Sequence, residues 1–114
     1  MVRTDKKGIN DRVLADVRQW VHQPFVIRRA ALEKGVPEGE IFADGIVELT
    51  RPLCSPATVQ STDWQEVRRV LIHAARDYDP DSSALRVLAP RRNMSVETAI
   101  AIEVLNVLWS FLER

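Results

Sequence analysis

The chain of 114 residues has the length of one domain, which can bury a real but modest hydrophobic core. Hydrophobic residues make up 46% of it and charged residues 28%, which is ordinary globular composition and excludes an intrinsically disordered chain. Its 16 acidic side chains balance its 16 basic ones, and the net charge of zero gives no support to nucleic-acid binding, which normally needs a basic protein.

Cysteine content and hydropathy indicate in which cellular compartment the protein is expected. Cys54 is the only cysteine, so an intramolecular disulfide is impossible and the chain needs no oxidising compartment. The opening residues, MVRTDKKGINDR, are partly basic, but the apolar stretch of a signal peptide does not follow them. No run approaches the ~18 apolar residues of a membrane span. We therefore expect no membrane association and a cytoplasmic location.

The first predicted element is a helix from Asn10 or Asp11 to about Gln23. Residues 1–9 are polar, and we expect a flexible arm there, followed by a single helical domain over 10–114. At ~100° per residue the apolar side chains of the helix form one stripe, as in a helix that lies on a core. These side chains are Val13, Leu14, Val17, Trp20 and Val21.

A second helix is predicted over PFVIRRAALEKG, residues 24–35. Pro24 suits the first turn, where its missing N–H costs nothing. Gly35 can end the helix in a left-handed cap, and Pro37 reinforces the break.

The segment PEGEIFADGIVELTRP, residues 37–52, is compatible with two structures. As a helix, it places four apolar side chains on one side, Ile41, Phe42, Ile46 and Leu49. As a hairpin, it offers Asp44-Gly45, a favoured two-residue turn, between EIFA and IVEL. The alternation in those flanks is imperfect, so we favour the helix and keep a short β-hairpin at 40–50 as the alternative.

The remaining elements complete an all-α bundle of four to five helices. The segment RPLCSPATVQS has two prolines and no period, and it is predicted to be a loop. Ser61 or Thr62 then caps a helix over 63–78, and either Thr62 with Gln65 or Asp63 with Glu66 has the spacing of a capping box. Residues 79–93 form a connector with one short turn at 84–88, and Ser95 caps the closing helix.

The closing helix, MSVETAIAIEVLNVLWSFLER, has an unusually wide apolar surface. Its polar side chains occupy an arc of ~80° and its apolar ones about 240° of the remainder, whereas a surface helix needs little more than ~100°. Either this helix is central and its own chain covers it, or one side meets a second chain. The second interpretation predicts an arginine-rimmed interface, suited to a homodimer. The interface residues would be Ile102, Leu105, Leu108, Trp109, Leu112, Arg91 and Arg92.

No group of side chains makes a convincing catalytic or metal site, and we expect no cofactor. Cys54 lies in no glycine-rich elbow and has no fixed distance to His22 or His73, so we interpret it as a spectator thiol. The alternating aspartates of DYDPDSS resemble the start of a calcium loop, but its sixth position is Ser82 and its twelfth is Leu88. The histidine spacing matches no zinc pattern, and no phosphate-binding glycine loop occurs.

The segment AALEKGVPEGEI resembles the centre of a helix-turn-helix in the spacing of Ala31, Gly35 and Ile41. Its second helix would turn acidic side chains towards phosphates, which carry the same sign of charge, so binding of nucleic acid is not expected.

These observations favour a small non-catalytic regulatory module. We expect it to form a homodimer and to act as an antagonist or adaptor that binds another protein, such as a transcription activator. A helix-turn-helix regulator that binds DNA, and a small enzyme with an unrecognised site, are the alternatives.

Overall fold

The computed structural model describes residues 3–75 and 95–113, and this part of the chain contains six α-helices, one 3-10 helix and no strand. The all-α prediction is therefore confirmed for these residues. The helices are α1 (Lys6–His22), α2 (Pro24–Lys34), α3 (Glu38–Thr50), η1 (Arg51–Leu53), α4 (Pro56–Ser61), α5 (Trp64–Ala75) and α7 (Val96–Leu112).

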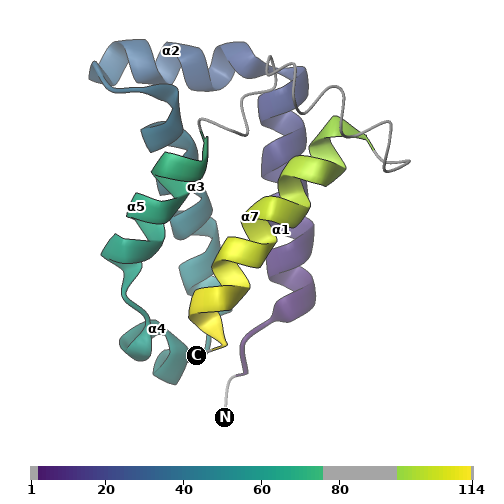
Figure 1. The fold of residues 1–114 in the computed structure, drawn as a ribbon, viewed down its shortest axis with the longest axis vertical. Helices are drawn as coiled ribbons and strands as arrows, with labels where there is room; N and C mark the ends of the chain where they lie inside the picture. The colour runs from purple at the N-terminus through teal and green to yellow at the C-terminus, as the bar shows by residue number, and fades with distance from the viewer. Residues whose placement is uncertain (1–2, 76–94, 114) are drawn as a thin grey trace.

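Four long helices run along the molecule and α2 crosses one end of them (Figure 1). α1 packs against α7, and ion pairs at both ends of the two helices show that they are antiparallel: Lys6 pairs with Glu113, and His22 pairs with Glu97. α3 packs against α5 and also contacts α1 and α2. The short α4 lies at the end of the molecule opposite α2, near both chain termini.

The hydrophobic core joins α1, α3, α5 and α7. The rings of Trp20 and Phe42 stack there with their centroids 4.4 Å apart. Thr50 is buried among these apolar side chains, and its hydroxyl donates a 2.7 Å hydrogen bond to the Ile46 carbonyl, which avoids the cost of an unpaired buried polar group. The other fully buried side chains include Ile9, Val13, Val17, Ile46, Val67, Leu71, Ile100, Val104 and Leu108.

The first helix begins earlier than predicted. α1 starts at Lys6, and Asp5 caps it by accepting a 2.9 Å hydrogen bond from the backbone N–H of Gly8. Ile9 is fully buried in the core, and the Thr4 hydroxyl accepts a hydrogen bond from the backbone N–H of Ser55. Residues 3–9 are thus part of the fold and not the predicted flexible arm, because the buried Ile9 side chain and the Asp5 cap hold this polar segment against the domain.

The ambiguous segment forms a helix, which rules out the β-hairpin. α3 covers Glu38–Thr50, and Phe42, Ala43, Ile46 and Val47 are buried along one side of it. The buried side chains recur with the helical period of 3.6 residues, which is the pattern that favoured a helix in the sequence. Asp44, the expected turn residue, instead forms a 2.6 Å ion pair with Arg68 of α5.

The segment predicted as a loop contains two short helices. Pro52 and Pro56 lie in the first turns of η1 and α4, where proline is tolerated, and Ser55 caps α4 by accepting a hydrogen bond from the backbone N–H of Thr58. The two prolines therefore mark helix starts as well as breaks. Helices of three and six residues are too short to show a periodic pattern of apolar side chains, so the sequence did not reveal them.

Most predicted helix ends are confirmed. Gly35 ends α2 with φ of 67°, and Ser95 caps α7 by accepting a hydrogen bond from the backbone N–H of Thr98. The cap of α5 is Asp63, one residue beyond the predicted Thr62, since its carboxylate accepts a hydrogen bond from the backbone N–H of Glu66. The predicted connector with its turn at 84–88, and the aspartates of DYDPDSS, lie outside the described residues.

Candidate protein-interaction surface

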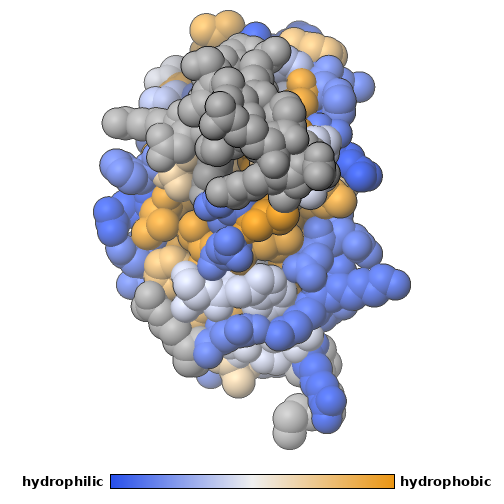
Figure 2. Space-filling model, turned by 45° about the vertical axis from the view of Figure 1, so that its right-hand side comes forward, coloured by the Kyte–Doolittle hydropathy of each residue, from blue (hydrophilic) through white to orange (hydrophobic). Residues whose placement is uncertain are grey.

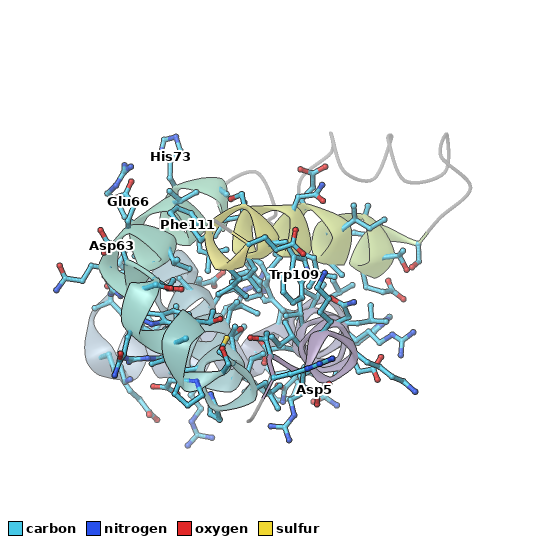
Figure 3. All side chains as sticks on the ribbon, turned by 90° about the horizontal axis from the view of Figure 1, so that it is seen from below. Asp5, Asp63, Glu66, His73, Trp109 and Phe111 are labelled. Atoms are coloured by element: carbon cyan, nitrogen blue, oxygen red, sulfur yellow. The ribbon has the colours of Figure 1, made fainter. Side chains whose placement is uncertain are left out.

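The wide apolar surface of α7 is covered largely by the chain itself. α7 packs between α1 and α5, and Figure 3 shows Trp109 extending from α7 towards α1 while Phe111 lies on the α5 side. The buried residues of α7 span ~200° of the helical wheel, from Ala99 round to Ala101, which is about twice the stripe of an ordinary amphipathic helix. The buried residues of α7 are Ala99, Ile100, Ala101, Val104, Leu108 and Phe111.

The predicted interface residues therefore divide into groups. Leu108 is fully buried in the core of its own domain, so it is not available to a partner and is removed from the predicted interface. Leu105 and Leu112 are half-buried against the same core. Ile102 remains 39% exposed, and Arg91 and Arg92 lie outside the described residues.

Trp109 makes its polar contacts within the domain. Its indole N–H donates a 3.2 Å hydrogen bond to the side-chain oxygen of Asn10, and the Lys6 ammonium lies 5.2 Å from the centroid of the ring. Lys6 also pairs with Glu113 at 2.6 Å. The half-buried tryptophan thus joins the C-terminal end of α7 to the N-terminal end of α1.

The opposite ends of these two helices meet at Glu97. A hydrogen bond from its own backbone N–H lowers the pKa of Glu97, burial opposes this effect, and His22 and Arg18 on α1 lower the pKa further. His22 lies 3.4 Å from the carboxylate. α7 is therefore tied to α1 by polar contacts at both ends, which leaves little of that side free for a second chain.

α2 carries the most exposed large apolar side chains among the described residues. Leu32 is 83% exposed and Phe25 is 65% exposed. They are seven residues apart, which separates them by only ~20° on the helical wheel, so they lie on one line along the helix. Ile27 and Ala31, which face the core, are ~120–160° away from Phe25 on the same wheel.

Charged side chains flank this apolar line. Arg29 forms a 3.3 Å ion pair with Glu33 one turn further along α2, and Arg28 forms a 3.1 Å ion pair with Glu38 at the start of α3. We call the outward-facing residues Phe25, Arg28, Arg29, Leu32 and Glu33 the α2 face.

A hollow adjoins the α2 face at its C-terminal end. It is a shallow depression of about 490 Å³, open to solvent, where α2 turns into α3. Its lining residues are Arg28, Ala31, Leu32, Gly35, Val36, Pro37 and Glu38. Arg28 and Leu32 belong to both features, so the face and the hollow form one continuous surface.

The α2 face is not among the predicted interface residues, although the sequence carries a signal for it. The segment FVIRRAAL places apolar side chains on opposite sides of a helix, Phe25 and Leu32 on one and Ile27 and Ala31 on the other. A helix that packs on one core needs only one of these sides. The sequence alone does not say which side faces the core.

The helix-turn-helix resemblance has a limited structural counterpart. α2 and α3 are joined by a tight turn through Gly35, as that motif requires. However, α3 is packed into the core, and Glu48 is its only exposed residue. Glu40 and Asp44 pair with Arg68. The helix that would read DNA is thus both covered and acidic.

No arrangement of the described side chains suggests chemistry at Cys54 or at the histidines. Cys54 is buried, and burial raises the pKa of its thiol, which disfavours the reactive thiolate. His22 and His73 lie on different helices, and Figure 3 shows His73 pointing outward from α5. The described residues hold no group of three His, Cys, Asp or Glu suited to a metal ion.

No helix among residues 3–75 and 95–113 has the length and hydropathy needed to span a membrane. Comparisons of the chain with protein families, with curated proteins and with solved structures gave no match.

Proposed function

We propose that the chain is a small non-catalytic interaction module that acts in the cytoplasm as an antagonist or adaptor. It binds another protein, for which a transcription activator is the candidate class, and it also binds a second copy of itself. The observation that supports the proposal is the α2 face, where Phe25 and Leu32 stay exposed on one line of a helix.

The energetics of the α2 face support a role in binding. Single exposed apolar side chains are common on soluble proteins and need no explanation. Here an aromatic and an aliphatic side chain share a line with two arginines, and aromatic side chains and arginine are enriched in protein interfaces. Burying each of the two apolar side chains would contribute about 1.5–3 kcal/mol to an association.

Substitutions on the α2 face should also disturb the core less than substitutions on the buried side of α7. The Phe25 side chain takes no part in the hydrophobic core, so it can be replaced without opening a cavity. The interface first expected on α7 is therefore proposed for α2, with Ile102 as the exposed apolar residue that α7 retains.

Affinity capture with matched variants tests the proposal. The immobilised wild-type chain, the double variant Phe25→Glu/Leu32→Glu and the control Gln60→Glu/Gln65→Glu are each exposed to lysate of the native cells. All four positions are exposed, and both variants add two negative charges. We expect one protein to be retained by the wild type and the control and lost from the α2 variant, with circular dichroism unchanged. If no protein distinguishes the α2 variant from the control, α2 is not the binding surface.

A further inference from the structure

We draw no further inference here: the strongest candidate, the apolar surface at the α2 end of the molecule (Figure 2), where Phe25 and Leu32 adjoin an open hollow, is the surface already proposed to bind another protein, and nothing in the described part of the chain shows what else covers it.

Discussion

Leu108→Ala should destabilise the domain far more than Ile102→Ala, although both residues belong to the apolar surface of α7. Leu108 is fully buried where α7 meets the shared core, whereas Ile102 is 39% exposed. Truncating a buried leucine costs the lost transfer free energy plus that of the cavity, about 3–5 kcal/mol in a tightly packed core. Because a domain of this size has only about 5–15 kcal/mol of stability, the loss is a large fraction of the total.

Ile102→Ala has two small effects of opposite sign. It removes apolar surface that is only partly buried, which costs stability, and it places alanine, a better helix former than isoleucine, in a helix interior. We expect a net change below about 1 kcal/mol in the free energy of unfolding.

Urea denaturation followed by far-UV circular dichroism separates the two outcomes. With a slope of about 1–3 kcal/mol per M urea, Leu108→Ala should lower the midpoint by roughly 1–5 M, and Ile102→Ala should change it several times less at the same slope. Measurements at several protein concentrations separate any contribution from association. Equal midpoint shifts for the two variants would refute the packing of α7 described above and would return Leu108 to the candidate interface.

Two further predictions concern α3 and its neighbours. Gly45→Ala should stabilise the domain by about 0.5–1 kcal/mol, because alanine is the better helix former and the nearest atom to its methyl group is a carboxylate oxygen of Asp16 at 3.7 Å. Gly39→Ala should not stabilise it, because the methyl group would lie 3.3 Å from the Ala75 side chain and 3.4 Å from the Ile72 carbonyl. Equal gains in the thermal midpoint of the two variants would contradict this difference in spacing. Burial raises the pKa of Asp16, so its charged form costs the folded state stability at neutral pH, and Asp16→Asn should be the more stable protein there. The advantage should shrink as the pH falls through the raised pKa and should be lost below the ordinary Asp value of about 3.9; urea midpoints that differ equally at pH 7 and at about pH 3 would show that the carboxylate charge is not the cause.

The sequence by itself determined the local structure well. Pro24, Gly35 and Ser95 marked helix ends correctly because capping and backbone conformation depend on a few neighbouring residues. The helical period of residues 38–50 favoured a helix over a hairpin but left the hairpin open, and the structure confirms the helix. Where local signals failed, as at residues 3–9 and 51–61, the helices are short or polar and their ends are fixed by contacts with each other.

Which apolar sides are exposed follows from how the helices pack against one another. A helical wheel gives the angles between side chains within one helix, but it does not give the direction in which the neighbouring helices lie. The apolar surface of α7 is wide because α1 and α5 cover it from two directions, so that Leu108 is core. α2 has a narrower apolar side and lies across the end of the bundle, which leaves Phe25 and Leu32 facing outward. Exposure is set by where other segments of the chain pack, and neither the composition of a helix nor its period contains that information.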